Sequence, residues 1–144
     1  MRILGMNAIL AVIMTAWMLS GCMAQKNQPV ADLESQLVDR EWVAEYILDQ
    51  PVIDSSHSSI VFTEDGAVSG MGGCNRFNGQ YTLTDGKVAL GPLATTMMAC
   101  VPPLDDQEIR FFQSLSEPLA VKFENGLLYL VAADGRKSVF AIQN

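Results

Sequence analysis

GMGGCNRFNGQYTLTDGKVALGPLATTMMAC, residues 70–100, is the stretch from which the fold can be worked out. The pairs Asn78-Gly79 and Asp85-Gly86 are of the kind that forms tight hairpin turns. After each pair, polar and apolar residues alternate as they do in a half-buried strand. Because these strands lie between Cys74 and Cys100, the stretch is predicted to be a β-meander that a disulfide could close.

The sequence on both sides of this stretch predicts more short strands, separated by turns that contain Gly, Asn or Asp. The first strand would place Trp42, Ala44 and Tyr46 on one face, although a helix through residues 34–48 is the alternative. Together these segments predict a mainly β (α+β) fold, a small antiparallel barrel or highly curved sheet of about eight short strands. The expected strands cover residues 40–47, 59–62, 67–70, 80–83, 87–90, 119–123, 127–131 and 138–142.

One α-helix is expected over residues 105–117. Asp105 is predicted to cap its first turn, and Glu108 to reach back to the same turn as in a capping box. The helix would pack across one opening or face of the barrel, since apolar residues recur along it at helical spacing. The residues predicted to face the core are Ile109, Phe112 and Leu115, with Phe111 beside them.

Residues 1–21 have the pattern of a bacterial lipoprotein signal peptide. Arg2 is followed by an apolar run up to Leu19. The sequence Leu19-Ser20-Gly21-Cys22 then matches the lipobox, in which the cysteine is lipidated before cleavage. The competing interpretation is a transmembrane anchor, because the run approaches the length that spans a bilayer. Cys22 is therefore the predicted lipidation site and mature N-terminus.

The rest of the chain is predicted to form a lipid-attached tether and one domain. Residues 22–37 are mostly polar and are expected to be a flexible tether, whereas residues 38–144 are expected to fold. Membrane attachment would come from the lipid on Cys22. Because Met23 is not the Asp typical of inner-membrane retention, we expect the protein at the outer membrane, facing the periplasm.

Charge and cysteine content exclude several classes of function. The formal net charge is −7, so the phosphates of a nucleic acid would repel the protein and no nucleic-acid partner is expected. With Cys22 lipidated, Cys74 and Cys100 remain as an even pair in a compartment that permits disulfides, the alternative being two buried free thiols. His57 is the one histidine, and a zinc site needs about four ligands of the His or Cys kind, so no metal is expected.

Two separated blocks of this sequence resemble the META-domain family, the HslJ-like bacterial lipoproteins. They are GGCNRFNGQY at residues 72–81 and GPLATTMMAC at residues 91–100, and a weaker resemblance runs from about Trp42 to the C-terminus. The sequence departs from the family at Met97, where Arg or Lys is usual, so a role of that basic side chain does not carry over. The resemblance implies a compact, mainly antiparallel β fold with one helix, located in the bacterial envelope, and no established enzyme activity.

The candidate binding residues are Asn75, Arg76 and Asn78, in the loop after Cys74. The same residues also have a purely structural interpretation, since Asn favours turns and Arg forms surface ion pairs. His57 lies in a serine-rich loop without a catalytic motif, so no enzyme and no cofactor are expected. We expect a monomeric, non-catalytic envelope lipoprotein that binds a partner and supports envelope integrity or stress tolerance, as the resemblance implies. The alternative is a carrier of a small apolar ligand in the barrel interior or mouth.

Overall fold

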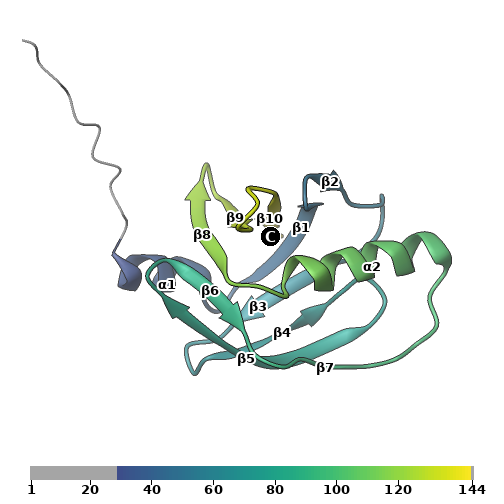
Figure 1. The fold of residues 1–144 in the computed structure, drawn as a ribbon, viewed down its shortest axis with the longest axis horizontal. Helices are drawn as coiled ribbons and strands as arrows, with labels where there is room; N and C mark the ends of the chain where they lie inside the picture. Colours follow the sequence, from purple (N-terminus) through teal and green to yellow (C-terminus); the bar gives the residue numbers. More distant parts are fainter. Residues whose placement is uncertain (1–28, 144) are drawn as a thin grey trace, which may run out of the picture.

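Eight antiparallel strands close into a barrel in the computed structural model, which describes residues 29–143 (Figure 1). Closure comes from β1, which pairs with β3 on one side and with β10 on the other. The mainly β barrel predicted from the sequence is thus confirmed. The barrel strands are β1 (Glu41–Ile47), β3 (Ser59–Phe62), β4 (Ala67–Met71), β5 (Arg76–Thr84), β6 (Lys87–Leu90), β8 (Leu119–Glu124), β9 (Leu127–Val131) and β10 (Lys137–Ile142).

Two further strands of two residues each lie beside the barrel. The first, β2 (Gln50–Pro51), pairs with the end of β1. The second, β7 (Ala94–Thr95), pairs with the start of β5 and lies off the main path of the sheet. Because β6 pairs with the other end of β5, the chain passes from β6 to β7 along one edge of that long strand.

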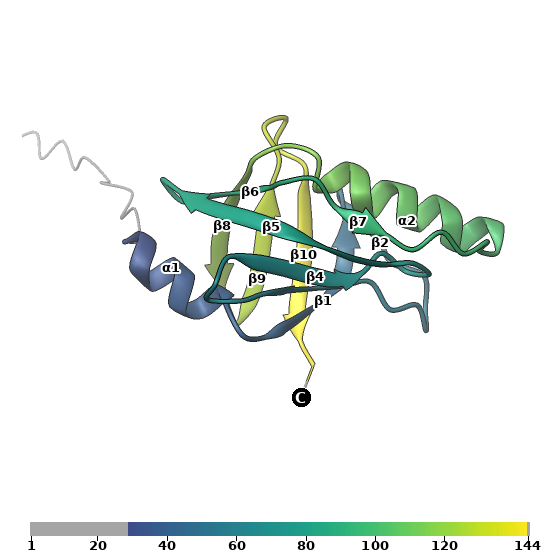
Figure 2. The same cartoon turned by 90° about the horizontal axis from the view of Figure 1, so that it is seen from below.

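Two helices lie toward opposite ends of the barrel, α1 (Val30–Leu37) and α2 (Pro102–Ser114) (Figures 1 and 2). The sequence predicted one helix and a flexible tether up to residue 37, and both predictions are wrong over residues 30–37. Leu33 and Leu37, one helical turn apart, are buried in the core. The indole Nε1 of Trp42 also donates a hydrogen bond to the carbonyl of Leu37 at 2.9 Å. Two leucines therefore fix α1, although none of its other residues is buried.

The predicted signal peptide, the lipidation site Cys22 and the beginning of the predicted tether lie outside the described residues. Within residues 29–143, neither helix is long and apolar enough to cross a membrane.

Side chains from the strands and from both helices fill the barrel interior. Phe111 of α2 is fully buried and packs against Phe77, Phe112 and Phe140, with ring centroids 5.6–6.5 Å apart. The hydroxyl of Tyr81 donates to the carbonyl of Thr63 at 3.0 Å, so this aromatic ring is buried without leaving its polar atom unpaired. The largest fully buried hydrophobic side chains are Trp42, Phe62, Phe111, Phe140, Leu37, Ile47, Ile60, Leu119, Leu128, Leu130 and Val68.

One of the two predicted hairpin turns is confirmed and the other is wrong. Asp85 and Gly86 have positive φ angles of 52° and 72° and connect β5 to β6. Asn78-Gly79, in contrast, lies inside β5, and the turn between β4 and β5 falls at residues 72–75. Gly79 is required for another reason: an added Cβ would lie 2.9 Å from the carbonyl oxygen of Pro92. The glycine lets the segment before β7 approach β5 closely.

The first strand is confirmed, but its predicted alternation fails at the end. The pairing of β1 with β10 shifts between Ala44 and Tyr46, which is the signature of a β-bulge. The extra residue turns Tyr46 to solvent, where 47% of its surface is exposed, while Ala44 and Ile47 are buried.

Candidate functional site

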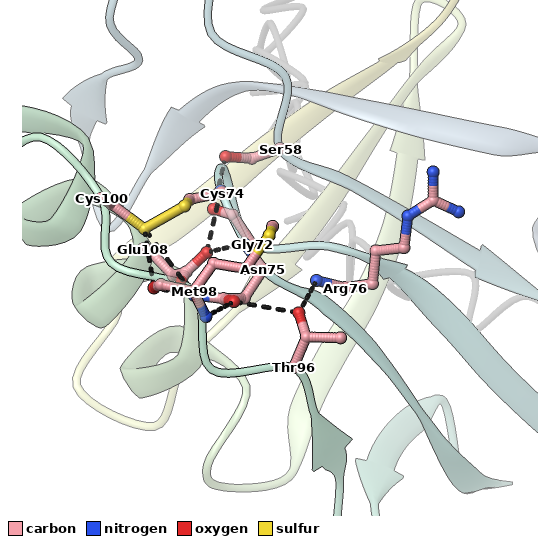
Figure 3. The surroundings of a disulfide bond; sticks show 9 residues. All are labelled: Ser58, Gly72, Cys74, Asn75, Arg76, Thr96, Met98, Cys100 and Glu108. Carbon is pink, nitrogen blue, oxygen red and sulfur yellow. Dashed lines mark hydrogen bonds between the residues drawn. A yellow bond between two sulfur atoms is a disulfide. The ribbon is translucent and has the colours of Figure 1, made fainter.

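A disulfide joins the turn before β5 to the segment that enters α2. The sulfur atoms of Cys74 and Cys100 are bonded, with their Cα atoms 6.1 Å apart. The two residues are 26 positions apart in the chain. The bond therefore closes the whole region that contains β5, β6 and β7, as Figure 3 shows for its surroundings.

Asn75 is buried beside this disulfide and is saturated with hydrogen bonds. Its Nδ2 donates to the carbonyl of Met98 at 3.2 Å and to Oε1 of Glu108 at 2.6 Å. Its Oδ1 accepts from the hydroxyl of Thr96 at 2.9 Å and from the backbone N–H of Met98 at 2.6 Å. Asn75 thus holds together the β5 turn, the segment after β7 and the helix α2 (Figure 3).

Glu108 supplies the acidic group of this cluster. Its Oε2 accepts the backbone N–H groups of Cys74 at 2.9 Å and of Asn75 at 2.5 Å, in addition to the bond from Asn75 to Oε1. The side chain is buried, and within residues 29–143 no Lys, Arg or His pairs with it. Three hydrogen-bond donors therefore stabilise a carboxylate that has no cationic partner.

The predicted capping box of α2 is wrong because Glu108 is used in this way. The helix begins after Val101, with proline at its first positions and no side-chain cap. Proline suits the first turn because it has no N–H group to satisfy. The signal missed in the sequence is the spacing of Glu108 from Phe111 and Leu115, three and seven residues later, which places the acid on the buried face of the helix.

Gln107, the neighbour of Glu108, ties a second loop to α2. Its Oε1 accepts the backbone N–H of Ile53 at 2.7 Å, and its Nε2 donates to the hydroxyls of Ser56 and Ser58 at 2.9 and 3.1 Å. Ser58 donates in turn to the carbonyl of Gly72 at 2.7 Å. Two consecutive polar residues of α2 therefore hold the β2–β3 loop and the β4–β5 turn in place.

The three residues predicted to form a binding loop do not form one site. Asn75 is buried, whereas Arg76 and Asn78 lie exposed along β5. The guanidinium of Arg76 points away from the disulfide cluster in Figure 3, while its backbone N–H donates to Thr96 Oγ1 at 3.0 Å. Asn78 lies opposite Ser69 of β4 and Ala94 of β7. Strand alternation places Arg76 and Asn78 on the same outer face of β5, whereas Asn75, in the turn before the strand, is buried in the cluster.

His57 lies between Ser56 and Ser58 in the β2–β3 loop and pairs with Glu41. Its Nε2 is 3.0 Å from Oε1 of Glu41, with both side chains substantially exposed. The pKa of the Glu41 carboxyl is lowered, first by the hydrogen bond with His57 and then by one with the hydroxyl of Ser59.

A groove runs beside the disulfide cluster, between α2 and the segment from β6 to Ala99. Its volume is about 710 Å³. Leu90, Leu93 and Met98 form one wall, and Phe112 of α2 and Leu115, which follows the helix, form the other. Asn75 and Glu108 also line the groove and are hydrogen-bonded to each other. The groove therefore has apolar walls and a polar floor.

Comparison with known proteins identifies the family. The family model described as "META domain" matches residues 35–144, which is most of the chain. This protein belongs to the META-domain family. Its sequence is 29% identical over 130 residues to "Heat shock protein HslJ" of Escherichia coli K12, covering 89% of this chain and 91% of HslJ.

Two solved structures share the fold of this META-domain chain. An NMR structure of a protein from Burkholderia xenovorans covers 99% of both chains at 25% identity, with a TM-score of 0.65. A second NMR structure covers 74% of this chain and 92% of its own, at 30% identity and a TM-score of 0.60. In the present chain, the two blocks that resemble the family meet in space, since Cys74 and Asn75 come from the first and Thr96, Met98 and Cys100 from the second.

We predict that Cys74 and Cys100 form the disulfide in the purified protein and that the bond stabilises the fold. Mass spectrometry after alkylation without reduction should find neither cysteine alkylated. The Cys74→Ala, Cys100→Ala double variant should lose about 2–4 kcal/mol of unfolding free energy, because its unfolded chain is less constrained. Two alkylated thiols in the native protein would contradict the prediction.

Proposed function

We propose that this META-domain protein is a non-catalytic lipoprotein of the bacterial envelope that supports tolerance of heat or envelope stress by binding a partner. The observation that carries the proposal is the similarity to a protein named as a heat shock protein, over 89% of this chain. The lipobox that ends at Cys22 supports attachment to a membrane, and its sequence context favours the outer membrane facing the periplasm.

The use of polar groups at the site supports binding over catalysis. A catalytic centre needs a nucleophile, and a base within hydrogen-bond reach of it. Here the sulfur of Cys74 is in the disulfide, and the carboxylate of Glu108 accepts three hydrogen bonds that hold the fold. Asn75 is occupied in the same way. These groups serve to fix the shape of the surface around them.

Lipidation at Cys22 gives the first test. Cys22→Ser should abolish labelling of the protein by radioactive fatty acid and leave the uncleaved precursor, because the sulfur that accepts the lipid is missing. The Cys74→Ser, Cys100→Ser double variant serves as the matched control and should keep its label. Persistent labelling of Cys22→Ser would show that the lipid is attached elsewhere.

The second test concerns the cellular role. A strain that lacks this protein should survive a heat challenge less well than its parent, and the wild-type gene should restore survival. Crosslinking in intact cells should join the protein to another envelope protein. A deletion strain that tolerates heat and detergents as its parent does, together with an absence of crosslinked species, would contradict the proposal.

The groove also favours a second candidate function, the transport of a small apolar ligand at the barrel mouth. Its volume of about 710 Å³ lies within the usual range for ligand sites, roughly 300–1,000 Å³. The barrel interior itself is filled by side chains, so the groove is the place for such a ligand. Displacement of an environment-sensitive dye by fatty acids would support the carrier, and failure of the dye to bind would remove it.

A further inference from the structure

The rim of the groove is unusually apolar for an exposed surface. Met97 and Met98, which line the groove, are 94% and 57% exposed, and Ile109 on α2 is 50% exposed. Ile109 belongs to the groove side of α2, because Asp105, Ile109 and Phe112 recur there at helical spacing. Large apolar side chains gathered around a cleft mark an interaction surface, and methionine adapts to varied partners.

One wall of the groove offers an open strand edge. The N–H of Thr96 donates to the carbonyl of Arg76 at 3.0 Å, and the N–H of Arg76 donates to Thr96 Oγ1, so this pair has the bonded register of the antiparallel ladder with a side-chain oxygen in place of one carbonyl. Thr95 lies opposite Phe77, which is the next pair along the ladder. Hydrogen-bonded and non-hydrogen-bonded pairs alternate in an antiparallel ladder, so Thr95 and Phe77 form a non-hydrogen-bonded pair. The N–H and C=O of Thr95 therefore face away from β5. Figure 2 shows β7 between β5 and α2, and Thr95 lines the groove.

The charges of the groove are of one sign. Asp105 and Glu108 are its charged lining residues. Glu108 is committed to the buried cluster, whereas Asp105 is exposed and forms no ion pair within residues 29–143. The whole chain carries a formal net charge of −7. An acidic segment, an anionic membrane surface or a second copy of this chain is therefore disfavoured, and a basic occupant is favoured.

We propose that the groove binds an extended basic and apolar segment of a partner protein, which adds to the free edge of β7 as a further strand. The backbone of Thr95 supplies hydrogen bonds, as in other cases of strand addition. Alternate apolar side chains of the segment enter the cleft lined by Leu93 and Phe112. A basic side chain of the segment approaches Asp105. This inference rests on the proposed function, because it names the surface and the kind of partner.

The test measures peptide binding to the full-length lipoprotein in neutral detergent, by fluorescence anisotropy. The probe is a capped peptide of about eight residues, a usual strand length, with alternating Val and Lys. Two matched peptides accompany it: one has Glu in place of Lys, and the other carries N-methyl groups that remove strand-forming N–H groups. The basic peptide should bind about tenfold more tightly than either of them.

Variants locate the site. Asp105→Lys should weaken binding of the basic peptide by about tenfold, since it turns an attraction into a repulsion. Asp106→Lys makes the same change of charge at the next residue, which does not line the groove, and should leave the affinity within about twofold. Hydrogen exchange at the Thr95 amide should slow when the basic peptide is bound, whereas exchange at exposed Asn125 should not change.

Each of the opposite outcomes overturns the proposal. Equal binding of the N-methylated peptide would exclude strand addition, and equal effects of the two lysine variants would place binding outside the groove. If no peptide binds, the groove is not a strand-addition site, even when the heat-survival and crosslinking experiments support the proposed function. If instead those experiments fail while the peptide binds as expected, the groove stands and the cellular role is wrong.

Discussion

Phe111→Ala is expected to lower the free energy of unfolding by about 3–5 kcal/mol. Phe111 is fully buried where α2 meets the barrel, and its ring packs against Phe77, Phe112 and Phe140. Truncation removes the apolar contact and leaves a cavity among rings that belong to three elements. The loss is large against a total stability of roughly 5–15 kcal/mol for a domain. Urea denaturation followed by the fluorescence of Trp42 measures it.

The matched control is Ile109→Ala on the same helix. Half of Ile109 is exposed, so its truncation should cost less than about 1 kcal/mol. Phe112 is only partly buried and should give an intermediate loss. A cost for Ile109→Ala as large as that for Phe111→Ala would mean that α2 packs through a different face.

Local sequence patterns predicted the strands well because most strands alternate and most turns carry their own signal. Asp85-Gly86 forms a turn, and residues 59–62, 87–90 and 127–131 are strands with the predicted bounds. The failures occur where distant parts of the chain decide the structure. Asn78-Gly79 has the composition of a turn, but its glycine serves the approach of Pro92, a contact that no local pattern reveals.

The same limit applies to both helices and to the site. In α1, Leu33 and Leu37 are buried against the barrel, and two leucines in a polar stretch do not predict a helix unless that contact is known. In α2, Leu115 is buried as predicted, but Glu108 and Phe111 are the buried residues where the sequence predicted Ile109 and Phe112. Glu108 fits a local capping box as well as it fits the buried face of the helix. The outcome is set by the backbone N–H groups of the distant β4–β5 turn.

Glu108→Ala should therefore be among the most destabilising substitutions in α2. It leaves three N–H groups without their acceptor: the backbone N–H groups of Cys74 and Asn75, and the one N–H of Asn75 Nδ2 that does not donate to Met98. Each buried donor without a partner costs about 1–3 kcal/mol. Because water can reach the groove beside the cluster, we expect a total loss of about 3–5 kcal/mol. Urea denaturation measures the loss, and faster hydrogen exchange at the amides of Cys74 and Asn75 would locate it.

Two further variants separate this role of the carboxylate from a general effect of charge. Glu108→Gln keeps an oxygen for the two backbone donors but turns an amide group toward Asn75, so it should cost about 1–3 kcal/mol, less than alanine. Glu117→Ala removes a negative charge from an exposed residue just beyond the helix and should change stability by less than about 0.5 kcal/mol. A Glu108→Ala protein as stable as Glu117→Ala would show that water replaces the carboxylate. The turn at residues 72–75 would then be held by the disulfide and by Ser58 without α2.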